Sequence, residues 1–197
     1  MSKTMRETLT AGRSIDLTSG PVARSMWLFA LPLMTGNLLQ QFYNVADTLI
    51  VGRFLGAGAL AAVGSSYTVM TFLTSVILGL CMGSGVLFSM LCGAGETERM
   101  KNSFVQSFFF IALVTGLVEG LALLLIDPML AVFQIPADIL KDTKAYLQII
   151  FIGLVFTFVY NYFAALLRAL GNSLVPLMFL AVSALGNIVL DLVLILG

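Results

Sequence analysis

The stretch QQFYNVADTLIVGR, residues 40–53, places an ionisable aspartate and three amides at the end of a long apolar run. The aspartate is Asp47, and the amides are Gln40, Gln41 and Asn44. A run of about 20 apolar residues is long enough to cross a membrane as a helix. Because lipid offers no hydrogen-bond partner, polar side chains in such a helix face protein or a water-filled cavity. This stretch therefore predicts a membrane helix with a polar face.

The composition of the whole chain indicates the same class of protein. Of its 197 residues, 59% are hydrophobic and 10% are charged, whereas soluble domains are about 25% charged. The mean hydropathy is +1.04, so we expect an all-α integral membrane protein that crosses the bilayer several times. The formal net charge is zero, which leaves no electrostatic case for a nucleic-acid partner.

Residue types that carry metal and acid–base chemistry are scarce in this sequence. Histidine is absent, and histidine is the commonest metal ligand and the commonest acid–base residue. Cys81 and Cys92 lie within apolar sequence without zinc or redox spacing, so we expect both to be buried thiols. We accordingly expect neither a resident metal centre nor an organic cofactor.

The apolar runs predict five spanning helices, separated by segments rich in charge, glycine and proline. Residues 1–24 form a polar tail, which we expect in the cytoplasm, and residues 25–197 form one membrane unit. A short interfacial segment is expected at residues 127–136. The predicted helices span about residues 26–52, 60–92, 104–126, 145–167 and 174–197.

Lysine and arginine predict the orientation, because they are enriched on the cytoplasmic side of membrane proteins. With the N-terminus inside, seven basic residues lie on the cytoplasmic side and three lie outside. The inside set is Lys3, Arg6, Arg13, Arg24, Arg99, Lys101 and Arg168, and the outside set is Arg53, Lys141 and Lys144. We therefore expect a multi-pass protein of the plasma membrane with a cytoplasmic N-terminus.

The polar residues of the first predicted helix fall on one helical stripe. They are Asn37, Gln40, Gln41, Asn44, Asp47 and Thr48, which recur at the three- and four-residue spacing of one helix face. Such amides can join helices through interhelical hydrogen bonds, or they can line a cavity. Because Asp47 lies in the same stripe, we favour a functional cavity.

The fifth predicted helix repeats this pattern with Ser183, Asn187 and Asp191, each four residues from the next. In the expected topology, Asp47 and Asp191 both come late in outward-running helices and so lie at similar depth. Two carboxylates and one amide at one depth can hold a cation such as sodium. They can also share a proton, since desolvation and like charge favour the neutral form of a carboxyl group.

Other residues within the spans have structural or functional readings that the sequence leaves open. Pro32 weakens the first helix and is either a packing feature or a hinge. Glu119 is a third acid in an apolar span with no polar stripe around it, and it either lines the cavity or has no special role. Asn161 adds a polar group to the fourth span. Gly79, Gly83 and Gly85 are small enough to allow close helix approach.

Two segments of the chain resemble the multidrug and toxic compound extrusion (MATE) family. They are FALPLMTGNLLQQFYNVADTLIVGRFLGAGALAAVG, residues 29–64, and LRALGNSLVPLMFLAVSALGNIVLDLVLILG, residues 167–197. The motifs that carry the resemblance are Pro32, Asp47, the GALAAVG run, the RALGN run that begins at Arg168, and Asn187 with Asp191. The resemblance covers residues 20–197.

The resemblance implies a secondary antiporter that exports cationic lipophilic compounds in exchange for protons or sodium. Members of the family have two six-helix lobes, and this chain would form most of the N-terminal lobe. Asp47, Asn187 and Asp191 match the ion-coupling residues of one subgroup, and Pro32 matches a proline linked to opening of the lobe cavity. The chain stops at DLVLILG after the fifth span, so we expect a truncated piece that needs the missing C-terminal lobe or a second chain.

Three other functions are weighed against this one. A lipid-linked oligosaccharide flippase needs a cationic cavity for pyrophosphate, whereas the cavity candidates here are acidic. A membrane-embedded enzyme lacks support because no catalytic motif is present. A non-transporting subunit or fragment is consistent with a chain that stops after five helices.

Overall fold

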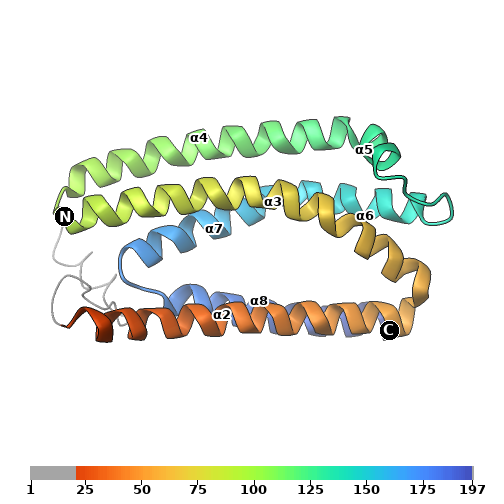
Figure 1. Ribbon diagram of the computed structural model, residues 1–197, viewed down its shortest axis with the longest axis horizontal. Helices are drawn as coiled ribbons and strands as arrows, with labels where there is room; N and C mark the ends of the chain where they lie inside the picture. Colours follow the sequence, from red (N-terminus) through yellow and green to blue (C-terminus); the bar gives the residue numbers. More distant parts are fainter. Residues whose placement is uncertain (1–20, 197) are drawn as a thin grey trace.

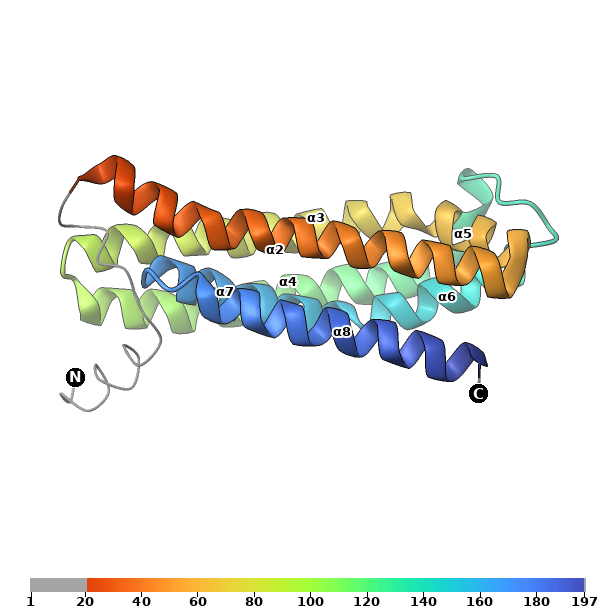
Figure 2. The same cartoon turned by 90° about the horizontal axis from the view of Figure 1, so that it is seen from below.

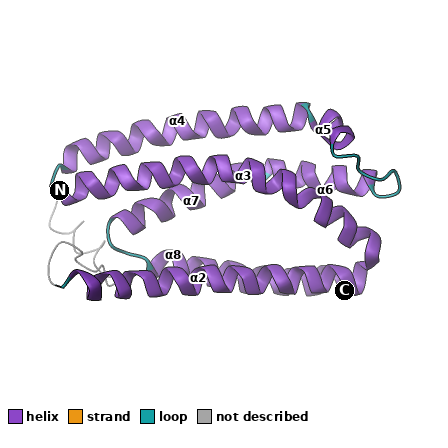
Figure 3. Cartoon of the chain, viewed as in Figure 1, coloured by secondary structure: helices purple, strands orange, loops and turns teal. Residues whose placement is uncertain are grey.

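The computed structural model describes residues 21–196, which form helices joined by short turns (Figure 3). No strand occurs within this described range. Most of the predicted tail, residues 1–20, lies outside the described residues, as does Gly197. The elements are α2 (Val22–Ile50), η1 (Val51–Leu55), α3 (Gly56–Gly93), α4 (Thr97–Leu124), α5 (Ile126–Val132), α6 (Leu140–Ile152), α7 (Leu154–Ala169) and α8 (Leu174–Leu196).

The helices form two groups that lie side by side along their lengths. Helices α3, α4, α6 and α7 pack on one another, and α2 packs mainly on α8. Figure 1 shows the α2–α8 pair along one side of the molecule, and Figure 2 shows the same pair in front of the other helices. The apolar core lies within the first group, so we call α3, α4, α6 and α7 the core group.

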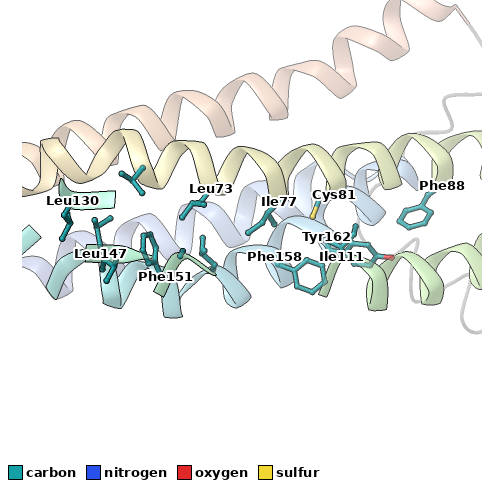
Figure 4. Close-up of a cluster of buried hydrophobic side chains, with 14 residues drawn as sticks. Leu73, Ile77, Cys81, Phe88, Ile111, Leu130, Leu147, Phe151, Phe158 and Tyr162 are labelled. Atoms are coloured by element: carbon teal, nitrogen blue, oxygen red, sulfur yellow. The ribbon is translucent and has the colours of Figure 1, made fainter. Parts of the chain in front are cut away.

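The core contains large apolar side chains and one buried tyrosine. Ile77 and Phe88 of α3 pack with Phe151 of α6 and Tyr162 of α7, and all four are 0% exposed (Figure 4). No residue of α2 or α8 belongs to this cluster. Many apolar side chains of those two helices lie on the outer surface, as expected where lipid is the solvent.

The two groups are joined by the turns at η1 and between α7 and α8. The chain reverses direction at η1, where Gly56 has a φ of +86°, a conformation that strains any residue with a Cβ. In the second turn, Gly171 has a φ of +80°. These two glycines therefore allow the chain to enter the core group after α2 and to leave it before α8.

The fourth predicted span is one broken helix, not one straight helix. Helices α6 and α7 meet at Gly153 with a bend of 41°. A Cβ at Gly153 would lie 3.1 Å from the carbonyl oxygen of Ile150. The bend leaves Thr143, Leu147 and Phe151 of α6 and Phe158 of α7 buried against the core group.

The described helices account for five passes across a membrane. Three segments are long and apolar enough to cross by themselves, and the bent α6–α7 pair gives a fourth. The first segment, Ala23–Gly93, has 71 residues and doubles back at η1 (Figure 1), so it holds two passes, α2 and α3. The predicted class, an all-α membrane protein with five spanning helices, is confirmed.

Two expectations about small residues in α3 are corrected by the packing. Only Gly85 makes a close helix contact, because its Cβ would lie 3.2 Å from the Cβ of Ala165 on α7. Gly79 and Gly83 have open space where a Cβ would be. Cys81 is buried as expected, but Cys92 is exposed near the end of α3.

Candidate functional site

Helices α2 and α8 run parallel and in close contact, which positions the candidate site. The Ser173 hydroxyl, just before α8, donates a hydrogen bond to the carbonyl oxygen of Phe29 on α2 (3.3 Å). Further along, Gly36 lets α2 approach Leu177 and Leu180 of α8, whose methyl groups would lie 3.5 and 3.6 Å from an added Cβ. The lack of a side chain at Gly36 therefore keeps the two helices in register.

The shared register brings Asp47 and Asp191 to the same level. Asp47 follows Phe29 by the same number of residues as Asp191 follows Ser173. Because both helices rise about 1.5 Å per residue, the two acids lie equally far from the Ser173–Phe29 contact. Their carboxyl groups are within hydrogen-bonding reach of each other across the α2–α8 contact.

The acid pair lacks a donor when both groups are ionised. Asp191 Oδ2 is buried and accepts no hydrogen bond from any described group. Two carboxylates can only accept hydrogen bonds, so a contact between them is favourable only when one carries a proton. The geometry is therefore suited to holding one proton, or another cation, between α2 and α8.

Two tyrosines from the core group lie near this pair of helices. The sequence shows Tyr160 as a polar group of the fourth span, whereas no pattern singles out Tyr146. Tyr146 of α6 lies within electrostatic range of Asp47. Tyr160 of α7 lies within electrostatic range of Tyr43 on α2. The Tyr160 hydroxyl also donates a hydrogen bond to the carbonyl oxygen of Pro176 on α8 (3.3 Å). Tyrosines in apolar spans were the available signal, but only the tertiary structure brings Tyr146 near Asp47.

The amide stripe of α2 makes its hydrogen bonds within its own helix. Asn44 Nδ2 donates to Gln41 Oε1 (3.2 Å), and the Thr48 hydroxyl donates to the carbonyl oxygen of Asn44 (2.8 Å). Asn37 and Gln40, like the other amides, are exposed and make no hydrogen bond to another described helix. The stripe is thus a polar surface that ends at Asp47.

The remaining predicted cavity residues make no hydrogen bond to the acid pair. Asn187 and Ser183 are exposed on α8, one and two turns before Asp191, and neither bonds to a carboxyl group of the pair. Asn161 is partly buried on α7, and its amide donates to the carbonyl oxygen of Thr157 (2.8 Å). Of the residues predicted to coordinate the ion, only Asp47 and Asp191 meet in this structure.

Pro32 and Glu119, whose roles the sequence leaves open, lie in α2 and α4. Pro32 lies within α2, which continues as one helix from Val22 to Ile50. Glu119 lies on α4 in the core group, partly buried, and makes no ion pair with a described residue. No group of three or more histidine, cysteine or acidic residues that could hold a metal ion gathers anywhere in the range 21–196.

Comparisons with known proteins agree with this architecture. A model of the MatE family matches residues 32–193. Two solved structures match with a TM-score of 0.85 and 23% identity, covering 92% of this chain and 40% of theirs. One is described as an outward-facing conformation of a multidrug resistance MATE family transporter, and the other as a transporter of the MOP superfamily from Pyrococcus furiosus.

Curated relatives match over the same part of the sequence. The probable multidrug resistance protein YpnP of Bacillus subtilis is 36% identical over 181 residues, which are 90% of this chain and 40% of that protein. The multidrug export protein MepA of Staphylococcus aureus is 28% identical over 182 residues, which are 90% of this chain and 39% of that protein. The chain thus spans about 40% of the length of these relatives. With a family model matched over most of its length and the fold of a MATE transporter, the chain belongs to the MatE family.

Proposed function

We propose that this chain forms the ion-coupling lobe of a cation-driven antiporter, which exports lipophilic organic cations across the plasma membrane with its N-terminus in the cytoplasm. The observation that carries the proposal is the meeting of Asp47 and Asp191 between two parallel membrane helices. The names of the relatives, which are multidrug resistance and multidrug export proteins, support export of such compounds.

Coupling arises from competition between the coupling ion and the drug for the same negative charge. When the pair is deprotonated, its carboxylates attract an organic cation into the polar surface along α2. When the pair takes up a proton from outside, the drug loses its counter-charge and is released. Because each ligand binds a different charge state, a proton gradient drives the drug outward.

We propose the proton as the coupling ion, in preference to sodium. The two carboxyl groups lie close enough to hydrogen-bond to each other, and such a contact requires a proton between them. A sodium ion needs several oxygen ligands around it, and Asn187 is exposed and bonded to neither carboxyl group. A proton shared between the two carboxyl groups supplies the donor that the pair otherwise lacks.

The rival functions predict different site chemistry. A flippase for lipid-linked oligosaccharides would need basic groups facing the pyrophosphate, whereas the groups that meet between α2 and α8 are acidic. A non-transporting fragment would keep the fold but not move a substrate. Because the chain spans about 40% of its relatives, the transport test requires the C-terminal lobe or a second chain as partner.

The test is dye efflux from proteoliposomes that contain the longest natural form of the protein. An imposed proton gradient should drive efflux of a fluorescent organic cation, and Asp47→Asn should abolish the dependence on the gradient. A sodium gradient in place of the proton gradient separates the two coupling ions. Asp127→Asn is the matched control, since Asp127 is an exposed acid on α5 whose ion pair is with Lys144. Such an exposed ion pair contributes little to stability, so this variant should transport normally.

Three outcomes would overturn parts of the proposal. Normal gradient-driven efflux by Asp47→Asn would show that the acid pair does not couple transport. Efflux driven by sodium alone would replace the proton as the coupling ion. Absence of efflux in the wild-type long form, with the protein folded, would support a different cargo or a non-transporting subunit.

A further inference from the structure

The contacts between α2 and α8 recur along one line of each helix. The first contact joins Phe29 to Ser173, and the last joins Asp47 to Asp191. In both helices 18 residues separate the first contact from the last. Because an α-helix has about 3.6 residues per turn, this spacing is about five full turns. The first and last contacts therefore lie on the same face of each helix.

Gly36 and Leu180 show that the two helices keep this alignment between the ends. Gly36 lies about two turns after Phe29, and Leu180 lies about two turns after Ser173. A Cβ added at Gly36 would lie 3.6 Å from a methyl group of Leu180. Contacts at matching positions at the start, within and at the end mean that α2 and α8 hold one axial register.

Buried polar groups fix the start of α8. Asn172 and Ser173 are 5% and 4% exposed. The Asn172 side-chain oxygen accepts a hydrogen bond from the backbone N–H of Val175 (3.1 Å), and the backbone N–H of Asn172 donates to the carbonyl oxygen of Leu167 on α7 (2.9 Å). The Ser173 hydroxyl then joins this turn to the Phe29 carbonyl oxygen on α2 (3.3 Å). The turn thus connects α7, α8 and α2 at one point.

We propose that Ser173 is a positioning residue for the acid pair, because its hydrogen bond to α2 sets the depth of α8 and so brings Asp191 level with Asp47. A helix has a nearly constant rise of about 1.5 Å per residue, so an anchor at one end sets the level of a side chain five turns away. The Ser173 hydroxyl acts through the helix, since its hydrogen bond is to α2 and not to either carboxyl group.

The other contacts between the two helices are less suited to set this register. Apolar packing at Gly36 limits how closely the helices approach, but it has no direction along the axis, whereas a hydrogen bond does. The acid pair cannot align itself when both groups are ionised, because the carboxylates then repel each other. The importance of the register for transport rests on the proposed function, whereas the register itself does not.

The experiment measures which residue of α2 lies level with position 191. The longest natural form, with its native cysteines replaced by alanine, is reconstituted in liposomes and treated with a short bismaleimide. Asp191→Cys is combined in turn with Asn44→Cys, Asp47→Cys or Val51→Cys, which are about one helical turn apart. Mass spectrometry of the digested protein measures the linked product, and the 47–191 pair should give the most.

Variants of Ser173 test the anchor in each of these three proteins. Ser173→Ala should lower the ratio of the 47–191 product to the other two by about threefold, the effect of losing one average interhelical hydrogen bond. Ser173→Thr keeps a hydroxyl and should restore the ratio. Ser66→Ala is the matched control, because Ser66 is a buried serine of α3 whose hydroxyl donates within its own helix, to the carbonyl oxygen of Ala62 (2.8 Å). A general loosening of the fold would lower all three products together and leave the ratio unchanged.

The outcomes separate this proposal from the proposed function. An unchanged ratio in Ser173→Ala, or equal amounts of the three products with Ser173 in place, would overturn the positioning role without bearing on transport. Proton-driven dye efflux is measured in parallel with both acids present, and Ser173→Ala should lower it by a similar factor. A changed ratio with unchanged efflux would support the positioning role and overturn the assignment of coupling to the acid pair.

Discussion

The hydroxyl of Tyr162 offers a test of what holds the core group together. Tyr162 of α7 is 0% exposed, and its hydroxyl donates to the carbonyl oxygen of Phe104 on α4 (2.6 Å). The same hydroxyl lies 2.7 Å from the hydroxyl of Ser107 on α4. Both contacts join α7 to α4, so Tyr162→Phe removes two interhelical hydrogen bonds and leaves the ring in place.

The expected cost of that change follows from the two bonds. Interhelical hydrogen bonds in membrane proteins average about 0.6 kcal/mol and reach about 1.7 kcal/mol, so Tyr162→Phe should lower the free energy of unfolding by about 1–3 kcal/mol. The ring itself packs against Phe88, with centroids 5.9 Å apart, and against Phe108, at 5.4 Å. Removing the ring as well, in Tyr162→Ala, adds the cost of about 3–5 kcal/mol for losing a buried aromatic side chain.

The assay is equilibrium unfolding in mixed micelles with increasing sodium dodecyl sulfate, followed by circular dichroism. Tyr160→Phe is the matched control, because its single hydrogen bond is longer (3.3 Å) and its side chain is 40% exposed. It should cost less than Tyr162→Phe. The reasoning is refuted if Tyr162→Phe is as destabilising as Tyr162→Ala, or if it costs no more than Tyr160→Phe.

Two further predictions concern the helix contacts and the acid pair. Gly85→Ala should destabilise the protein, because its Cβ would lie 3.2 Å from that of Ala165, whereas Gly79→Ala meets open space and should gain up to about 1 kcal/mol of helix propensity. Thermal unfolding of both variants checks this, and equal effects would contradict the packing at Gly85. Asp191→Asn gives the pair an amide that donates to Asp47, so this variant should lose less thermal stability than wild type as the pH rises above about 4, where an ordinary carboxyl group ionises. An identical loss in both proteins would show that the two carboxyl groups do not repel each other in the folded state.

Several features of the site were predictable because they depend only on spacing along one helix. The period of the polar residues in α2 placed Asp47 at the end of an amide stripe, and the structure has those amides exposed on one helix. The equal depth of Asp47 and Asp191 followed from two helices running in the same direction, and the acids do approach each other. The approach of Tyr146 to Asp47 was missed, because it depends on how α6 packs relative to α2.

The amino-acid sequence by itself determined that this chain is a bundle of membrane helices, because long apolar runs have no other way to satisfy their backbone groups in lipid. It also determined which face of α2 and of α8 is polar, since that depends only on the helical period. Only the tertiary structure decided which glycine makes a close contact, where the fourth span breaks at Gly153, and which acids meet. Those outcomes depend on contacts between residues far apart in the chain, where packing of one helix against another selects among faces that the sequence leaves equivalent.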